Sequence, residues 1–462
     1  IMLDYFHNFA AMGLTGLTDF FLPFLIVLSI LVFVHEWGHY IVARYYGVRV
    51  DVFSIGFGKE LFGWTDRSGT RWKVSLIPLG GYVQMFGDTD PSSSHNKYEM
   101  TEDNQTRPMT AEERRVAFFT KPVYQRAAIV FAGPAINFIF ALMILSCLYV
   151  VVGKPVTPPV AAGVIVDSAA DKGGLRPYDR VLNINGEKVE SFSDIQKRVA
   201  ISLNTPLDLT IERNGEILNL TITPEIQTME DRFGFSQSRG MMGVLGSDSG
   251  VNVNDIISIN GQNIQSLDPE AKKSLVNAVL GKDAVIELPK GNDEAQKLHV
   301  RLHSHAETGQ DDTKINAVYL TETSSKEIVK YGFTDALTAS VKESWFIVKG
   351  TVEAIGQIIT GTRSASELGG IVRIGAIAGD AAQNGMIALI SFMALLSINL
   401  GLINLFPIPL LDGGHLVFYT YEAIMGKPMS EKIMDYALKC GMVFLIGLMA
   451  FANLNDIVQI IL

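Results

Sequence analysis

Two histidines and a glutamate occur together in the run His35-Glu36-Trp37-Gly38-His39, which lies within a long apolar stretch. If this run is helical, side chains at positions i and i+4 lie on one face, so the two imidazoles can share one zinc ion. The glutamate between them can act as the general base that takes a proton from the attacking water. The spacing therefore predicts zinc-dependent peptide hydrolysis.

The apolar flanks of this motif argue against a chance match. An HExxH pattern arises at random in roughly one chain in a hundred of this length. Residues 20–43 surround the motif with enough apolar sequence to cross a bilayer. Ionisable side chains inside such a span are costly and usually functional. We therefore expect a metal centre that lies within the membrane.

The composition predicts a membrane protein with a large extramembrane part. The chain has 462 residues, of which 48% are hydrophobic, and its mean hydropathy is +0.24. A net charge of −10 argues against nucleic-acid binding, which requires basic patches. Cys147 and Cys440 both fall in apolar runs and are predicted to be buried thiols. The N-terminal region has neither a basic segment nor a small-residue cleavage site, so the first apolar segment is expected to be retained.

Four segments are long and apolar enough to be transmembrane helices, namely residues 20–43, 127–152, 386–406 and 436–454. Residues 340–360 carry charged side chains at helical spacing and predict an amphipathic helix on a surface or interface instead. Basic residues between the first two spans set the orientation, because positively charged loops stay in the cytoplasm. They are Arg44, Arg49, Arg114, Arg115, Lys121 and Arg126. Both termini and the block of residues 153–385 are then extracytoplasmic.

Asp412 is the candidate third zinc ligand, since a catalytic zinc commonly takes three protein ligands and leaves one position open. It follows the third span in the run Asn404-Leu405-Phe406-Pro407-Ile408-Pro409-Leu410-Leu411-Asp412-Gly413-Gly414. Pro407 and Pro409 interrupt regular helix, which lets the backbone turn the carboxylate inward. The first and third spans cross in the same direction, so both motifs reach a similar depth. A dication also compensates the charge of a carboxylate in this setting.

The extracytoplasmic block contains two similar β-rich segments. Residues 174–186 read Gly-Leu-Arg-Pro-Tyr-Asp-Arg-Val-Leu-Asn-Ile-Asn-Gly, follow a short apolar strand and resemble the PDZ fold. A weaker echo, ending in Ile-Asn-Gly, occurs at residues 254–261. The second copy is contracted before this turn, so it is predicted to be a degenerate PDZ-like domain. A generic β-hairpin with an Asn-Gly turn is the alternative for both.

Three motifs together resemble the site-2 protease family, in its RseP type of Gram-negative bacteria. They are residues 35–39, the Gly133-Pro134-Ala135-Ile136-Asn137 stretch of the second span, and residues 404–414. The resemblance implies an intramembrane zinc metalloprotease with one zinc ion per chain, with His35, His39 and Asp412 as ligands and Glu36 as base. It also implies a substrate site lined by Asn404, Gly133, Pro134 and Asn137.

The same resemblance implies a role and a location. The family's substrates are single-pass membrane proteins already shortened outside the cytoplasm, such as anti-sigma factors and remnant signal peptides. Their cleavage would serve envelope stress signalling. We therefore expect this chain in the bacterial inner membrane, with the lipid bilayer and such substrates as its partners.

Residues 71–85 are β-prone around a Gly80-Gly81 turn that precedes Tyr82. Their Pro-Leu-Gly-Gly-Tyr-Val stretch resembles the membrane-dipping β-loop of the family, and an edge strand there could pair with unwound substrate by β-augmentation. The alternative is a hairpin on the cytoplasmic surface. Asn404 could hold the substrate or the developing oxyanion, or cap backbone groups freed by the prolines. Asn137 could orient substrate or form a hydrogen bond between helices.

The predicted architecture is a multi-pass α-helical membrane protein with four transmembrane helices, two inserted extracytoplasmic PDZ-like α/β domains and a membrane-associated β-loop. We expect an N-terminal segment and first span at 1–62, the β-loop region at 63–122, the second span at 123–153, PDZ-like domains at 158–226 and 238–306, an amphipathic helix and linker at 320–384, the third span at 385–413, a cytoplasmic loop at 414–435 and the fourth span at 436–462. The active site then lies toward the cytoplasmic side, while the PDZ-like domains on the other side bind carboxyl termini or exclude bulky ectodomains. The Gly-rich residues 361–385 could form a mobile gate.

Two other classes of function fit parts of the sequence. A non-catalytic membrane scaffold could use PDZ-like domains to bind periplasmic protein termini. A metal transporter could use histidines and an aspartate within the membrane as an ion pathway. Zinc-dependent cleavage of a single-pass reporter protein is expected only of the protease.

Overall fold

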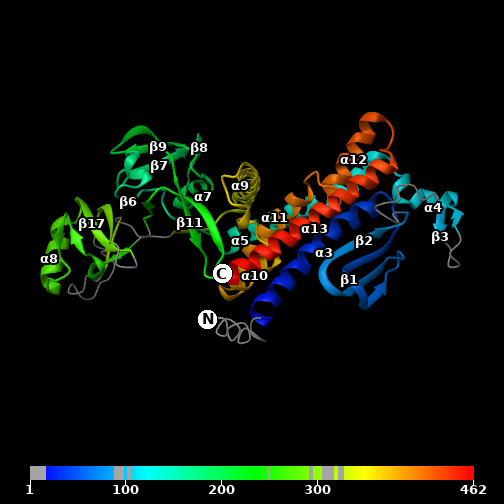
Figure 1. The fold of residues 1–462 in the computed structure, drawn as a ribbon, viewed down its shortest axis with the longest axis horizontal. Coiled ribbons are helices and arrows are strands. Elements are labelled where there is room, and N and C mark those ends of the chain that lie inside the picture. Colours follow the sequence, from blue (N-terminus) through cyan, green and yellow to red (C-terminus); the bar gives the residue numbers. More distant parts are fainter. Residues whose placement is uncertain are drawn as a thin grey trace.

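A computed structural model describes residues 17–87, 98–100, 106–247, 250–290, 295–303, 317–320 and 327–461. Figure 1 shows a helical part, with a long β-hairpin at one end of it, and a β-rich part at the other end. Within the helical part, α5 (Val123–Val151) packs against both α3 (Leu22–Tyr45) and α11 (Met386–Asn404). The candidate catalytic motif lies on α3, so α5 and α11 form its immediate surroundings.

Four helices in the described part of the chain are long and apolar enough to cross a membrane: α3, α5, α11 and α13 (Glu431–Ile461). They confirm the four predicted spans. The prediction that both cysteines are buried is wrong, because Cys147 on α5 and Cys440 on α13 are free and exposed on the protein surface. An apolar helix of this kind can present its side chains to lipid as well as to a core, so apolar sequence neighbours do not imply burial in protein.

The close approach of α3 and α5 depends on a glycine in the catalytic motif. A Cβ atom added to Gly38 would lie 2.4 Å from the carbonyl oxygen of Ala132 and 2.7 Å from Cγ2 of Ile136. Small residues at such crossings let two backbones approach closely. Gly38 therefore brings the histidine-bearing face of α3 against α5.

Strands β1 (Val50–Thr65) and β2 (Arg71–Met85) form the long antiparallel hairpin. Asp66 begins its turn, and the Asp66 carboxylate accepts hydrogen bonds from the backbone of Ser68 and Thr70 and from Nε1 of Trp72, at 2.8, 3.0 and 2.8 Å. Burial acts to raise the pKa of Asp66, but these hydrogen bonds outweigh it and lower the pKa to about 2. The hairpin turn is therefore held by a side chain that stays ionised at neutral pH.

The expectation of a turn at Gly80-Gly81 is wrong. Both glycines lie inside β2, where Gly80 adopts φ 137°, a value that favours glycine. The register between β1 and β2 shifts repeatedly along the hairpin. Gly80 therefore bends a continuous strand instead of ending it.

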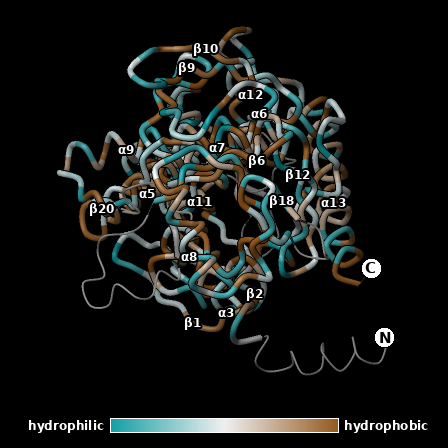
Figure 2. The backbone as a smooth tube through the Cα atoms, turned by 90° about the vertical axis from the view of Figure 1, so that its left-hand side faces the viewer, coloured by the Kyte–Doolittle hydropathy of each residue, from teal (hydrophilic) through white to brown (hydrophobic). Residues whose placement is uncertain are grey.

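Two β modules make up the β-rich part. The first contains the sheet β10-β9-β7-β8, and the second the sheet β13-β6-β18-β17-β15-β16. The strand bounds are β6 Gly163–Ile165, β7 Arg180–Ile184, β8 Glu187–Lys188, β9 Leu207–Arg213, β10 Glu216–Ile222, β13 Val244–Leu245, β15 Ser258–Ile259, β16 Gln262–Asn263, β17 Asp283–Pro289 and β18 Ala295–Arg301. Helices α6 (Ala169–Lys172) and α7 (Phe192–Ile201) belong to the first module and α8 (Pro269–Val279) to the second. Figure 2, with the modules in front, shows hydrophilic and hydrophobic stretches interleaved along them.

Strand β6 joins the two modules. It lies between β13 and β18 in the second sheet, although it precedes the first module in sequence. Val164 belongs to the apolar core of the first module, whereas its neighbour Ile165 packs against the core of the second. The side chains of this strand alternate between its two faces, so one strand supplies both cores. The two modules therefore share strand β6.

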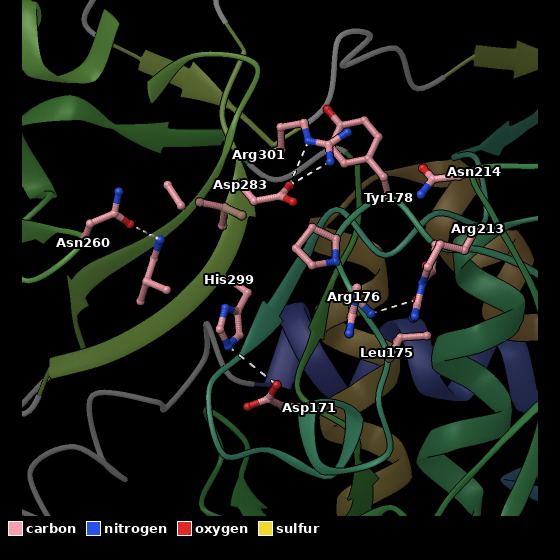
Figure 3. Close-up of a pocket in the computed structure, with 15 residues that line it drawn as sticks. Asp171, Leu175, Arg176, Tyr178, Arg213, Asn214, Asn260, Asp283, His299 and Arg301 are labelled. Carbon is pink, nitrogen blue, oxygen red and sulfur yellow. Dashed lines mark hydrogen bonds and ion pairs between the residues drawn. The ribbon is translucent and has the colours of Figure 1, made fainter. Parts of the chain in front are cut away.

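A cavity of about 400 Å³ lies at the seam between the modules (Figure 3). Across it, Nε2 of His299 lies 3.6 Å from Oδ1 of Asp171. On its first-module side, Arg213 donates two hydrogen bonds to the buried carboxylate of Asp179, at 2.7 and 2.6 Å. The hydrogen bonds to Asp179 raise the pKa of Arg213. The contact between His299 and Asp171 thus joins the two modules, whereas the contact between Arg213 and Asp179 lies within the first.

The end of α13 holds the segment before α10 (Ile371–Gln383) in place. Oδ2 of the buried Asp456 accepts hydrogen bonds from the backbone N–H groups of Gly370 and Arg373, at 2.8 and 3.0 Å. Oδ1 of Asn453 accepts another from Ile371, at 3.0 Å. These are N–H groups of the first turn of a helix, which have no partner within the helix itself. The fourth span therefore caps α10 from outside it.

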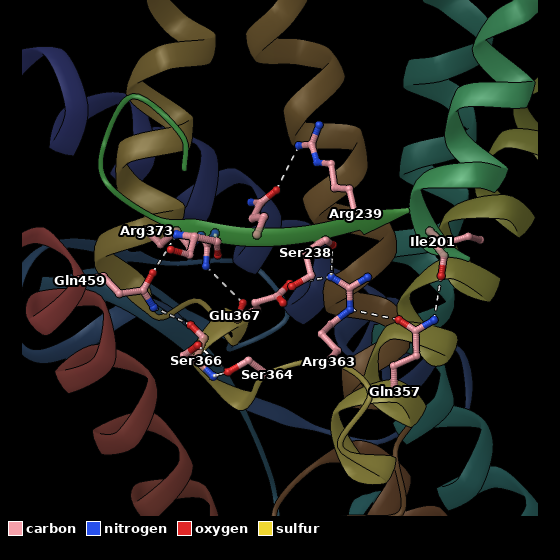
Figure 4. Close-up of polar contacts among 12 residues, drawn as sticks. Ile201, Ser238, Arg239, Gln357, Arg363, Ser364, Ser366, Glu367, Arg373 and Gln459 are labelled. Atoms are coloured by element: carbon pink, nitrogen blue, oxygen red, sulfur yellow. Dashed lines mark hydrogen bonds and ion pairs between the residues drawn. The ribbon is translucent and has the colours of Figure 1, made fainter. Parts of the chain in front are cut away.

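The same segment contacts the hairpin of β11 (Glu225–Glu230) and β12 (Ser236–Met241). Figure 4 shows Arg363 between Ser238 of β12 and Glu367, with hydrogen bonds of 3.0 and 2.6 Å. Gln459 of α13 bonds to Ser236 and to Ser366, at 3.0 and 2.6 Å. Residues 361–385, the predicted gate region, thus form hydrogen bonds with both the β11-β12 hairpin and α13.

The remaining elements complete the chain. Helix α9 (Phe333–Thr360) starts before the predicted amphipathic helix and ends with it, and α12 (Asp412–Met425) occupies much of the segment predicted as a loop. Shorter elements are η1 Leu17–Phe21, β3 Tyr98–Met100, β4 Thr106–Pro108, α4 Ala111–Val116, η2 Phe118–Thr120, β5 Lys154–Val156, β14 Gly250–Asn252, η3 Val253–Asp255, β19 Ala317–Tyr319, β20 Glu327–Val329 and η4 Ala365–Glu367. Helix α12 contacts α5 through an ion pair of 2.7 Å between Glu422 and Arg126.

Candidate metal centre

The two histidines of the motif lie one helical turn apart on α3, as the spacing predicts. Their Nε2 atoms are 3.3 Å apart and point to the same place. His39 is buried and His35 is half-buried. The helix alone is thus enough to bring these two nitrogen atoms together.

Asp412 reaches the histidines because the chain turns sharply after α11. Leu410 adopts φ 82°, an unusual conformation for a residue with a side chain, and α12 starts at Asp412. Cβ atoms at Gly413 or Gly414 would lie 2.3 and 2.4 Å from the carbonyl oxygens of Phe406 and Ile408. The two glycines therefore let α12 start directly against the turn, with Asp412 facing α3.

The three side chains form a set that fits a metal ion. Oδ2 of Asp412 lies 3.2 Å from Nε2 of His35 and 3.6 Å from Nε2 of His39. All three potential ligand atoms lie within 4.8 Å of one another. The Asp412 oxygen is buried and has no hydrogen-bond partner in the described part of the chain. A carboxylate oxygen and two imidazole nitrogens are ligands that zinc accepts, and a dication would satisfy the buried oxygen.

Gly133 on α5 provides the space for both imidazoles. A Cβ atom at this position would lie 2.2 Å from Nε2 of His39 and 2.9 Å from Cε1 of His35. Pro134 follows inside the helix and is buried. The structure therefore places Gly133 behind the two histidines, where a side chain would displace them.

Replacing Gly133 by alanine is expected to lower the zinc content of the purified protein and its peptide-hydrolysing activity by about 10-fold or more, because the added methyl group overlaps the imidazole of His39. Zinc per chain, measured by elemental analysis, tests this effect. Gly447→Ala is the matched control, since a Cβ at Gly447 meets no atom within 4 Å. Unchanged zinc in the Gly133 variant would contradict the expectation.

Each imidazole is also held through its second nitrogen. Nδ1 of His39 lies 2.9 Å from the carbonyl oxygen of Ile129, and Nδ1 of His35 lies 3.1 Å from Nδ2 of the Asn137 side-chain amide. Asn137 is fully buried, and its backbone carbonyl oxygen accepts a hydrogen bond of 2.8 Å from Ser397 of α11. Contacts of this kind orient histidines that bind metal. Asn137 thus contacts His35 directly.

Glu36 faces β2. A Cβ atom at Gly81 would lie 3.2 Å from Cγ of Glu36, and the backbone of Val83 forms a hydrogen bond with the Glu36 carboxylate. The ring of Tyr82 stacks on Phe57 of β1, with centroids 6.1 Å apart, and Gly80 also packs on Phe57. The hairpin therefore passes beside the candidate general base.

Asn404 is the last residue of α11 and is half-buried. Its side chain has no hydrogen bond to another described residue, so the capping role predicted for it has no contact in its support. The sequence also gave no signal for Ile129, Val83 or Ser397. Ile129 and Val83 act through backbone groups, and a hydroxyl on an apolar helix is too common to single out Ser397.

Comparisons with known proteins agree with this geometry. The model of peptidase family M50 matches residues 23–448. A protein of Agrobacterium fabrum that carries the name of a zinc metalloprotease is 37% identical, over 97% of this chain and 99% of the relative. A protein of Brucella suis with the same kind of name is 35% identical over 94% of each chain. The regulator of sigma E protease of Haemophilus influenzae is 31% identical over 95% of this chain and 98% of that protein.

Proposed function

Because this chain belongs to peptidase family M50 and is a zinc metalloprotease, we propose that His35, His39 and Asp412 hold its zinc ion. The observation that supports this most strongly is the buried Asp412 oxygen, which faces both Nε2 atoms and has no hydrogen-bond partner in the described chain. Two neutral imidazoles and one carboxylate leave the centre one positive charge and an open coordination position for the reaction.

Glu36 is the proposed general base. It lies between the two histidines in sequence and faces β2, where Val83 bonds to its carboxylate. A bound zinc ion polarises the scissile carbonyl and makes the attacking water more acidic. Glu36 takes the proton of that water and delivers it to the nitrogen of the leaving amine, so that one carboxylate serves as base and then as acid.

Strand β2 is the proposed binding edge for the substrate. A transmembrane helix must unwind before it can be cleaved, and its freed backbone groups then need partners. In the described chain β2 pairs only with β1, so its other edge is open for an extended peptide at Gly80, Gly81 and Tyr82. Substrate contacts at Gly133, Pro134 and Asn404 remain part of the proposal.

The hairpin is also proposed to dip into the membrane. Its outer part exposes large apolar side chains, namely Phe57, Leu61, Phe62, Trp64, Leu76 and Ile77. Such a surface is unfavourable in water and favourable at a bilayer boundary. A membrane-associated hairpin would bring its binding edge to the substrate within the lipid.

The proposed substrates are single-pass membrane proteins already shortened outside the cytoplasm, including anti-sigma-factor-type proteins and remnant signal peptides. The name of the Haemophilus influenzae relative supports a role in sigma-factor control. We place the chain in the bacterial inner membrane, with termini and β modules outside and the active site toward the cytoplasm, on the basis of the charged loops. The modules at 158–226 and 238–306 are proposed to be PDZ-like domains that check substrates.

This proposal is tested with two single-pass reporter proteins that share one transmembrane segment. One has a short extracytoplasmic tail and the other a folded domain in its place. The purified protein is expected to cleave the short reporter, to stop when a chelator removes zinc, and to recover when zinc is returned. The reporter with the folded domain is expected to resist cleavage. Failure to cleave either reporter with zinc present would refute the proposed single-pass substrates, and equal cleavage of both would refute the substrate check alone.

A further inference from the structure

The two histidines of the metal group must carry their hydrogens on Nδ1 if their Nε2 atoms are to bind a metal. A neutral imidazole has one N–H and one lone pair, and the lone pair is the ligand. In His39 the neighbouring carbonyl oxygen already requires that Nδ1 carry the hydrogen. Its Nδ1 faces the carbonyl oxygen of Ile129 at 2.9 Å, and a carbonyl can only accept a hydrogen bond.

His35 has a different partner. Its Nδ1 lies 3.1 Å from Nδ2 of the Asn137 amide. A half-turn of this amide group exchanges its NH₂ group, which donates, for its oxygen, which accepts. While the NH₂ group faces the imidazole, the hydrogen of His35 lies on Nε2, where it takes the place of the metal. If the oxygen faces it, Nδ1 keeps the hydrogen and Nε2 keeps its lone pair.

The surroundings of Asn137 suit this role. The residue is fully buried, so water does not compete for the contact. Its Oδ1 has no hydrogen-bond partner among the described residues, so no other contact prevents it from turning toward His35. The hydrogen bond from Ser397 holds the backbone of Asn137. Asn137 also follows Gly133 by one turn, on the face of α5 that contacts both imidazoles.

We propose that Asn137 is a positioning residue of the metal centre, whose side-chain oxygen accepts the Nδ1–H of His35 and thereby keeps Nε2 of His35 available to zinc. This inference rests on the proposed zinc site and deepens it. It assigns to Asn137 a contact with a ligand, in place of the substrate contact implied by the family resemblance.

The test measures the zinc dissociation constant of the purified full-length protein by competition with a chelating indicator. Asn137→Leu preserves size but removes the acceptor and is expected to weaken zinc binding by about 10- to 100-fold. Asn137→Asp supplies a carboxylate oxygen at the same place and is expected to bind zinc at least as tightly as the unaltered protein. Ser391→Ala is the matched control, because it removes a hydroxyl from the same helix, α11, whose hydrogen bond of 2.8 Å goes to Ile387 of that helix and not to Asn137. Zinc binding should stay unchanged in this variant.

The outcomes separate this inference from the proposed function. If Asp412→Ala weakens zinc binding and Asn137→Leu does not, the metal site stands and the role of Asn137 is refuted. If Asp412→Ala has no effect on zinc binding, the proposed site itself is wrong. Cleavage measured at saturating zinc gives the second readout. An Asn137→Leu variant with unchanged zinc affinity and a raised KM would assign Asn137 to the substrate instead.

Discussion

The Glu36→Gln variant is expected to lose peptide hydrolysis almost completely while it keeps its zinc. Glutamine has nearly the same shape as glutamate, so the packing of α3 against β2 is preserved, but its amide cannot take a proton from water. Removal of a general base typically costs about 10²- to 10⁴-fold in rate. The measurement is kcat/KM on the short single-pass reporter, together with zinc per chain.

Glu225→Gln is the matched control for this experiment. Glu225 lies exposed on β11, where it pairs with Lys172 at 3.2 Å, far in sequence from the catalytic motif. Exposed pairs of this kind contribute little to stability, so cleavage should stay unchanged. Cleavage that persisted in Glu36→Gln would remove Glu36 from the mechanism.

The Asp412→Ala variant is expected to lose zinc as well as activity. It deletes one of three proposed ligands, so zinc affinity should fall by more than the roughly 10- to 100-fold that the loss of an outer contact costs. The folded structure should survive, because the variant also removes a buried oxygen that has no hydrogen-bond partner in the described chain. Zinc affinity by chelator competition and thermal unfolding of the zinc-free protein measure the two effects.

Asp435→Ala provides the control for Asp412→Ala. Asp435 pairs with Lys439 one turn away on α13, at 2.7 Å, and that lysine is exposed. Its loss should alter neither zinc affinity nor cleavage. Together the two main variants separate chemistry from metal binding. Glu36→Gln should remove peptide hydrolysis alone, whereas Asp412→Ala should remove both peptide hydrolysis and zinc binding. A Glu36→Gln protein without zinc would make Glu36 part of the metal site.

The local properties of the sequence were enough to predict the spans and the first half of the metal group. Span length follows from the thickness of the bilayer, and the spacing of His35 and His39 follows from the pitch of one helix. Asp412 was predicted because a zinc site needs a third ligand and two prolines interrupt the preceding helix. The first two inferences depend on residues that are neighbours along the chain, and the third also compares the directions of two apolar spans.

Other features depended on contacts between distant segments. The Gly80-Gly81 pair looked like a turn, yet Gly80 and Gly81 lie inside β2, where Gly80 packs on Phe57 and Gly81 beside Glu36. Likewise, no sequence pattern indicated that β6 would contribute to both β modules, because a short apolar strand has the same pattern whichever sheet it joins.

The sequence by itself thus determined that a zinc-binding motif lies in a chain with four apolar spans. The tertiary structure decided how the site is held: Asp412 reaches the histidines, Gly133 leaves room for their rings, and Asn137 faces Nδ1 of His35. The physical reason is that helix pitch and hydrophobic length are properties of consecutive residues. Hydrogen-bond partners and steric fit arise only where separate helices meet.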